Sequence, residues 1–281
     1  MKIVKVLNNN VVVSQNAAGK EVIVMGKGLA FGKRSGERIN ESLVDKVFSL
    51  NGSKEISRFQ ELLETISEEC MELAEECIDF AKVKLGKKMQ NAIYISLTDH
   101  INTMLERAKL GAYLKNTLLW DIKRVHREEF LIGRESVLKV NAKMGTNFDD
   151  NEAASIALHF VNAQTELGFG TTTKITKVMS EILNIIKYHF RIDYDEDSLS
   201  YYRLIVHLRH FAQRLFSKTT FSDADDSELL EHIKGKYPMA YECSQLIKEF
   251  IAKQYEYVLE QEECLYLTIH ISKVVKESKK V

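Results

Sequence analysis

The sequence predicts a multidomain protein in which a small antiparallel β domain precedes two homologous all-α helical-bundle domains. Three observations lead to this fold class. Short β-branched runs fill the first 50 residues, and amphipathic runs at helical spacing fill the rest, with Pro238 as the only proline. Two histidine-bearing segments of the helical part recur later in the chain.

The β domain is expected within residues 1–55. Its strand candidates are Ile3–Val6, Val11–Val13, Val22–Met25 and a run inside residues 44–50. The polar stretches NNN (8–10) and QNAAGK (15–20) separate the first three, and a glycine-rich stretch (26–39) precedes the fourth. A module of this size buries little core of its own, so we expect it to dimerise.

The helical domains are expected at residues 58–168 and 171–281. NGSKEIS (51–57) is interpreted as the first linker, after which the apolar residues take up a period of 3.6. TELGFGTTTK (165–174) interrupts this pattern with glycines and a threonine run, and we expect the second linker there.

Composition limits the classes of protein that this chain can belong to. A hydrophobic content of 45% with 28% charged residues is typical of a globular protein. The net charge of −1 is unevenly spread, because residues 1–55 hold nine Lys/Arg against five Asp/Glu. Such a basic head suits an N-terminal anion-binding module. Cysteines without a CxxC pair, no secretory signal and no long apolar run predict a cytoplasmic protein without membrane insertion.

Four of the eight histidines form an internal repeat. SLTDHI (96–101) matches RLIVHL (203–208), which places His100 and His207 107 residues apart. DDNEAASIALHFV (149–161) matches EQEECLYLTIHIS (260–272), which places His159 and His270 111 residues apart. Each predicted helical domain therefore contains one copy of the same histidine pair.

The charged neighbours of these histidines are duplicated as well. Arg107 and Arg214 each follow their histidine by seven residues. Glu152 and Glu263 each precede the second histidine of their pair by seven. Seven residues are nearly two helical turns, so each partner shares a helix face with its histidine. Arg107 and Arg214 are our candidates for pairing with a phosphoryl group on the ring.

Three interpretations of the paired histidines compete. They are satisfied core residues of a structural repeat, metal ligands, or phosphoryl acceptors. The wide spacing and the missing HExxH-type motif disfavour a metal site. Neutral imidazole is a good nucleophile near neutral pH, which favours phosphoryl acceptance. An enzyme would need a carboxylate–histidine metal cluster or a nucleotide-binding loop, and the sequence contains neither motif. We therefore expect no catalytic residues, no metal and no cofactor.

The basic head offers groups suited to nucleic acid. Lys5 and Lys27 can neutralise phosphates. Asn8 and Asn10 can hydrogen-bond base edges, and Phe31, within GKGLAF (26–31), can stack on a base. The alternative is a tight turn with a core phenylalanine.

Together these motifs resemble the BglG/LicT family of bacterial transcriptional antiterminators. The resemblance covers essentially the whole chain and is carried by MKIVKVLNNNVVV, VMGKGLAFGKRSGE, KVFSL, IYISLTDHI and the duplicated histidine helices. It implies a dimeric β-type RNA-binding domain followed by two regulation domains of the sugar phosphotransferase system. The function implied is an antiterminator that binds a hairpin in the leader of a sugar-utilisation mRNA, with β-glucoside utilisation the nearest type.

The resemblance also implies roles for individual residues. RNA-contacting positions fall on Lys5, Asn8, Asn10, Gly26, Lys27 and Phe31. Phosphorylatable positions fall on His100, His159, His207 and His270. The implied partners are the RNA hairpin, the phosphocarrier protein HPr, a sugar-specific enzyme II and a second copy of the chain. The alternatives are a histidine-phosphorylated DNA-binding activator, which would need a helix-turn-helix head, and a phosphotransfer enzyme.

Overall fold

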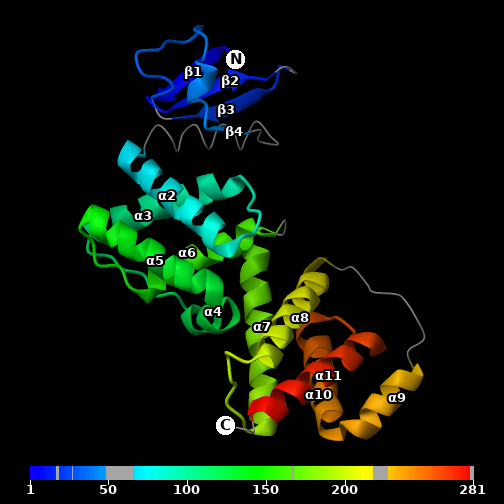
Figure 1. Ribbon diagram of the computed structural model, residues 1–281. Coiled ribbons are helices and arrows are strands. Elements are labelled where there is room, and N and C mark those ends of the chain that lie inside the picture. Colours follow the sequence, from blue (N-terminus) through cyan, green and yellow to red (C-terminus); the bar gives the residue numbers. More distant parts are fainter. Residues whose placement is uncertain (17–18, 27, 49–65, 166–167, 218–226, 279–281) are drawn as a thin grey trace. The chain divides into compact units, whose positions relative to one another are not determined.

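The computed structural model describes residues 1–16, 19–26, 28–48, 66–165, 168–217 and 227–278 (Figure 1). The predicted linker at 51–57 and the RNA-contact candidate Lys27 lie outside these residues. The chain divides into two compact units. The first comprises Met1–Lys115 and Leu131–Thr165, and the second comprises Asn116–Phe130 and Glu166–Val281.

The N-terminal part of the first unit is a four-stranded antiparallel sheet in the order β1-β2-β3-β4. Its strands are β1 (Ile3–Asn8), β2 (Val11–Gln15), β3 (Glu21–Met25) and β4 (Lys46–Phe48), with the 3₁₀ turn η1 (Glu41–Leu43) before β4. The β-branched runs form the strands because their side chains pack well on a pleated, half-buried surface. A small core that includes Ile3, Val12 and Leu29 lies against it. The predicted β domain is confirmed.

The rest of the first unit is helical. Its helices are α2 (Glu68–Leu85), α3 (Ala92–Lys109), α5 (Arg127–Met144, of which the residues from Leu131 on belong to this unit) and α6 (Asp150–Ala163). Helix α3 packs against both α2 and α6. Gly133 of α5 lies so close to α6 that an added Cβ would overlap the carbonyl oxygen of Ala153. This packing holds α3 and α6 side by side, and these two helices carry the first histidine pair.

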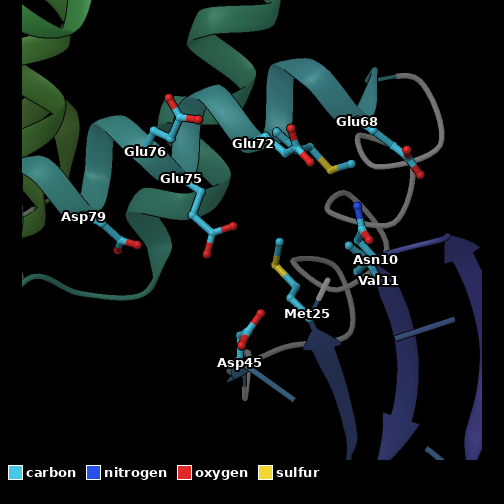
Figure 2. Close-up of a pocket in the computed structure, with 11 residues that line it drawn as sticks. Asn10, Val11, Met25, Asp45, Glu68, Glu72, Glu75, Glu76 and Asp79 are labelled. Atoms are coloured by element: carbon cyan, nitrogen blue, oxygen red, sulfur yellow. The ribbon is translucent and has the colours of Figure 1, made fainter. Parts of the chain in front are cut away.

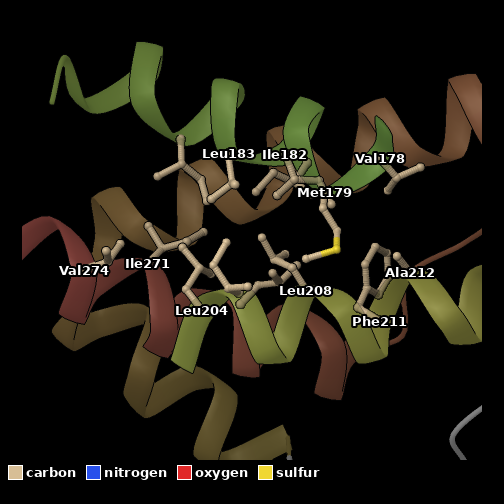
Figure 3. Packing of buried hydrophobic residues seen from close by; sticks show 14 of the residues in the cluster. Val178, Met179, Ile182, Leu183, Leu204, Leu208, Phe211, Ala212, Ile271 and Val274 are labelled. Carbon is tan, nitrogen blue, oxygen red and sulfur yellow. The ribbon is translucent and has the colours of Figure 1, made fainter. Parts of the chain in front are cut away.

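The second unit is also helical. Its helices are α4 (Leu119–Val125), α7 (Phe169–Phe190), α8 (Leu199–Ser217), α9 (Ser227–Lys236), α10 (Pro238–Tyr255) and α11 (Gln261–Ser278). Figure 3 shows their core, in which Ile182 of α7, Leu208 of α8 and Ile271 of α11 meet. Helix α8 packs against α7 and α11. It therefore has a buried face toward the core and a second contact with the helix that carries His270.

The second linker differs from the prediction, because α7 begins at Phe169 and takes in most of residues 165–174. Threonine and glycine are poor helix formers, so local propensity argues against this helix. Tertiary packing reverses that preference: Thr172 and Thr176 are buried. Their hydroxyls bond the carbonyl oxygens four residues earlier, at 3.3 Å and 2.9 Å.

The four cysteines, Cys70, Cys77, Cys243 and Cys264, are buried and form no disulfide. Among the described residues, no group of three or more His, Cys, Asp or Glu side chains is placed to hold a metal ion. None of the described helices combines the length and the apolar character that spanning a membrane requires.

Candidate functional site

The first histidine pair is assembled by the packing of α3 on α6. His100 of α3 and His159 of α6 lie 59 residues apart in the chain, yet their ring centroids are 4.9 Å apart with the planes tilted by 43°. Both side chains are only partly exposed. The duplicated histidines are thus neighbours in space, which sequence spacing alone does not establish.

A buried carboxylate links this pair to its arginine. The Glu152 side chain is only 6% exposed, and its Oε2 lies 3.0 Å from His100 Nε2. Its other oxygen, Oε1, accepts a hydrogen bond of 2.9 Å from Arg107 Nη2. Burial alone would raise the pKa of Glu152, but the His100 hydrogen bond and the His100 and Arg107 charges outweigh it, so the pKa is lowered. Glu152 is therefore an anion at neutral pH that orients His100.

His159 is held in its neutral form. Burial, with a further contribution from His100, lowers the pKa of His159 to about 3. Its Nδ1 lies 3.2 Å from Ser96 Oγ, on α3 one turn before His100. A neutral imidazole keeps a lone pair on one ring nitrogen at physiological pH, which is the form that can act as a nucleophile.

The second pair repeats this arrangement on α8 and α11. The ring centroids of His207 and His270 are 4.8 Å apart and the planes are nearly parallel, at 30°. Burial, followed by the nearby charges of His270 and Arg214, lowers the pKa of His207 to about 3. Burial also lowers the pKa of His270, and the charges of Lys273 and Arg203 add to this. Both rings are therefore predominantly neutral at pH 7.

The buried glutamate of the second pair is bound differently. Glu263 Oε1 accepts hydrogen bonds from Arg214 Nη2 at 3.0 Å and Nε at 3.3 Å. Glu263 Oε2 accepts from the Tyr257 hydroxyl at 3.3 Å and from the Glu260 backbone N–H at 3.4 Å. His207 Nε2 is buried and has no hydrogen-bond partner among the described residues. Thus Glu152 is hydrogen-bonded to the ring of His100, whereas the second oxygen of Glu263 accepts from the Tyr257 hydroxyl and a backbone N–H.

In the first domain Glu152 links the predicted arginine to the histidine pair, whereas in the second Arg214 is bonded to Glu263, which is held by Tyr257 and a backbone N–H rather than by a ring. Arg107 and Arg214, the candidates for pairing with a phosphoryl group, are each bonded to the buried glutamate of their domain. The seven-residue spacing indicated these glutamates, but not that they would accept from the arginines. Ser96 and Tyr257 were missed, because the equivalent positions of the other domain hold different residues, Arg203 and Thr146, so comparing the two copies does not single them out.

On the β domain, residues 28–32 form turns, but Phe31 is 76% exposed, so the interpretation of Phe31 as a core residue is wrong. Lys5 is exposed as well. Asn8 and Asn10 both help to shape the loop: Asn8 Oδ1 accepts from Asn10 N at 2.9 Å, and Asn10 Oδ1 accepts from Gly28 N at 2.7 Å. Their amide groups thus stiffen the loop that presents Phe31.

Gly26 has a packing role that its sequence motif does not reveal. It is buried, and a Cβ at this position would overlap the carbonyl oxygen of Leu43. Close backbone approach of this kind is open to glycine alone. The predicted contact residue therefore also determines how the loop after β3 packs against η1.

One pocket of the first unit lies between this loop and α2 (Figure 2). Its lining combines Asn10, Met25 and Gly26 with carboxylates of α2, which are Glu68, Glu72, Glu75, Glu76 and Asp79. Lys46 forms an ion pair with Glu75 beside it. Such an acidic wall repels a phosphate backbone. Phe31 and Lys5 do not line this pocket, and they are the exposed ones among the described members of the predicted RNA-contacting set.

Comparison with known families accounts for both the sheet and the paired helices. Residues 1–57 match the CAT RNA-binding domain, and residues 75–163 and 180–274 match the PRD domain. The chain is 49% identical to the transcription antiterminator LicT of Bacillus subtilis (strain 168), over 99% of this chain and 100% of that protein. The chain belongs to the BglG/LicT family of transcriptional antiterminators.

Two further similar proteins cover different shares of this chain. The β-glucoside operon antiterminator of Dickeya chrysanthemi is 43% identical, over 99% of this chain and 98% of the relative. The crystal structure of GlcT CAT-PRDI is 31% identical, covers 59% of this chain and 98% of that chain, and superposes with a TM-score of 0.52. In family terms the sheet is the CAT domain, and the two histidine pairs lie within the two PRD matches.

Proposed function

We propose that this chain is an RNA-binding antiterminator that stabilises a hairpin in the leader of a sugar-utilisation mRNA, with β-glucosides as the sugar class. The family and the names of the relatives support this role. The CAT domain, as a dimer, clamps a hairpin that overlaps a terminator, and RNA polymerase then reads through. No bond in the RNA is broken, because the energy comes from preferential binding of one RNA fold.

Lys5, Asn8, Asn10, Gly26, Lys27 and Phe31 are the proposed RNA-contacting residues. Phe31 is the best supported of the described members, because an aromatic side chain exposed on a small polar domain is suited to stacking on an unpaired base. Gly26 acts by allowing the loop to pack closely, and Asn8 and Asn10 act partly by ordering that loop.

The control of RNA binding is proposed to come from phosphorylation of His100, His159, His207 and His270 by the sugar phosphotransferase system in the cytoplasm. HPr acts on the second pair and activates, and the sugar-specific enzyme II acts on the first pair and inhibits. The observation that carries this proposal is the twofold occurrence of one arrangement: two adjacent histidine rings on a pair of helices that a buried glutamate bound to an arginine also links.

The physical basis of the switch is electrostatic. A phosphoryl group adds up to about two negative charges and three acceptor oxygens to a ring. In the first domain it would lie next to Glu152, an anion bonded to Arg107, and in the second on a ring carried by helices that the bond between Arg214 and Glu263 links. Arg107 and Arg214 can then exchange the carboxylate for the phosphoryl group, which changes how the two helices that carry the pair are held together.

Reconstitution tests the proposal directly. The full chain is incubated with phosphoenolpyruvate, enzyme I and HPr, with and without a β-glucoside-specific enzyme II, and phosphohistidines are mapped by mass spectrometry. Binding of a leader hairpin is followed by mobility shift in the same samples. We expect phosphate on the second pair with HPr and tighter RNA binding. Phosphorylation without any change in RNA affinity would contradict the proposed control.

A further inference from the structure

The residues that flank the two histidine pairs along their helices, here called the rim of each pair, differ in charge at equivalent positions. Arg203 precedes His207 by four residues, and its equivalent before His100 is Ser96. Lys273 follows His270 by three residues, and its equivalent after His159 is Asn162. The repeat therefore conserves the buried residues of the site and replaces two rim positions by cations in the second copy alone.

The helical spacing places both cations on the histidine face of their helices, four residues before His207 and three after His270. Ser96 bonds His159, the ring on the opposite helix, with Oγ and Nδ1 3.2 Å apart. Arg203 occupies the matching place on α8, and its charge acts on His270, again the ring on the opposite helix. Lys273 acts on the same ring from α11. Both cations are exposed, and neither forms an ion pair with any described residue.

Other rim differences run in the same direction. Asp99, exposed beside His100, has Val206 as its equivalent in the second domain. Thr103 is replaced by the exposed His210, and Ser155 by Tyr266, whose ring centroid lies 5.9 Å from that of His207. The first rim is therefore neutral to acidic, and the second is cationic with an aromatic edge.

We propose that Arg203 and Lys273 form a phosphoryl-binding clamp that makes the second histidine pair the faster acceptor, independently of any docking protein. This inference rests on the proposed phosphorylation of these rings. The incoming phosphoryl group carries about two negative charges, so cations whose charge reaches the ring stabilise both the transfer and the product. Ser96 and Asn162 offer hydrogen bonds at the equivalent positions but no charge.

A chemical donor isolates this effect, because it has no docking surface. In phosphoramidate the phosphorus carries an amine. The lone pair of a ring nitrogen forms the new N–P bond, the P–N bond of the donor breaks, and ammonia leaves with that electron pair. Charge is conserved, since the zwitterionic donor and the phosphorylated ring, protonated on its other nitrogen, each carry a net charge of −1.

The experiment treats the full chain with phosphoramidate and measures the rate of phosphohistidine formation at each pair by quantitative site mapping. We expect the second pair to react about three- to tenfold faster. Arg203→Ser with Lys273→Asn should remove this advantage, and the reciprocal Ser96→Arg with Asn162→Lys should transfer it to the first pair. Ser96→Ala separates the gain of charge from the loss of the His159 hydrogen bond. Lys253→Asn, at an exposed lysine near the end of α10, is the control for net charge.

The outcomes distinguish this inference from the function on which it rests. If the second pair reacts no faster than the first, or if the two exchanges leave the ratio of rates unchanged, the clamp is wrong while phosphorylation stands. If none of the four histidines is phosphorylated by phosphoramidate or by the phosphoenolpyruvate-driven system, the proposed function itself fails. Circular dichroism of each variant confirms that the helices remain folded.

Discussion

At the residue scale, each pair of helices that carries two histidines also carries one buried carboxylate bound to an arginine. Glu152 accepts from both Arg107 and His100, whereas Glu263 accepts from Arg214 and Tyr257. A buried charge requires partners that offset its desolvation, and in both domains an arginine fulfils this need. The ring that shares the first carboxylate is orientated by it, while the equivalent ring of the second domain lacks this bond. Two copies of one site have thus acquired different hydrogen bonding.

The lowered pKa values of His159 and His207 predict that stability declines in acid. Both groups have a folded pKa of about 3, below the ordinary value of 6.5. The unfolded chain therefore takes up protons first as the pH falls, and their contribution to stability, complete above about pH 6.5, is lost between pH 6.5 and 3. The loss approaches about 1.4 kcal/mol per pH unit for each histidine.

Urea unfolding at pH 7 and pH 5 gives the free energy of unfolding of the parent chain and of the double variant His159→Asn with His207→Asn. We expect the double variant to lose less stability between the two pH values than the parent chain does. Equal losses in the two proteins would show that these rings do not govern the acid response.

Phe31 gives a second prediction at this scale. Phe31→Ala should weaken hairpin binding by about 1–3 kcal/mol, the usual contribution of one aromatic–base stack, and leave the melting temperature unchanged. Leu29→Ala is the matched contrast, because Leu29 is buried in the same loop and its truncation should destabilise the sheet. Mobility shift and thermal melts of both variants test the pair. A melting temperature lowered as much by the Phe31 change as by the Leu29 change would refute stacking.

At the scale of elements, two close backbone approaches position the candidate sites. Gly26 allows the loop after β3 to lie against Leu43, and Gly133 allows α5 to lie against α6 at Ala153. The first orders the loop that carries Phe31, and the second positions the helix that carries His159. In each case the absence of a side chain determines the distance between elements.

Alanine substitutions at two glycines of the β domain distinguish the stability cost of close packing from that of backbone strain. Gly26→Ala should destabilise the domain by about 3 kcal/mol or more, since the new methyl group meets backbone that cannot rotate away. Gly28 has a φ of +66° but open space around it, so Gly28→Ala should cost only about 1 kcal/mol of backbone strain. Chemical denaturation of the full chain gives the free energy of unfolding of both variants. A Gly28 variant as unstable as the Gly26 variant would disprove the packing role.

At the scale of the whole molecule, a duplicated helical module follows a small β domain. The head is basic, with nine Lys/Arg against five Asp/Glu in residues 1–55, and the remainder is acidic. The module that is proposed to sense phosphate therefore differs in charge from the one that binds RNA. A domain of this size gains stability from a second copy, so control of dimerisation is an economical way to control RNA binding.

Mimicking the charge of phosphate in the second domain tests this model. His207→Asp with His270→Asp should strengthen the dimer and raise hairpin affinity by about tenfold, because each substitution places a negative charge near Arg214 or the exposed cations. His232→Asp, at an exposed histidine outside the repeat, is the control. Sedimentation velocity and RNA titration provide the measurements. An unchanged association state together with unchanged affinity would exclude the switch.

The sequence by itself determined the fold class, the twofold histidine repeat and the family, because these depend on patterns that are local in the chain: β-branched runs, a helical period and matched segments. Only the tertiary structure decided that residues 59 apart form one ring pair, that the arginines bond the glutamates, and that Phe31 is exposed. It also showed that the threonine run after Gly168 is helical. The physical reason is that burial and side-chain partners arise from contacts between distant segments, which local propensity does not contain.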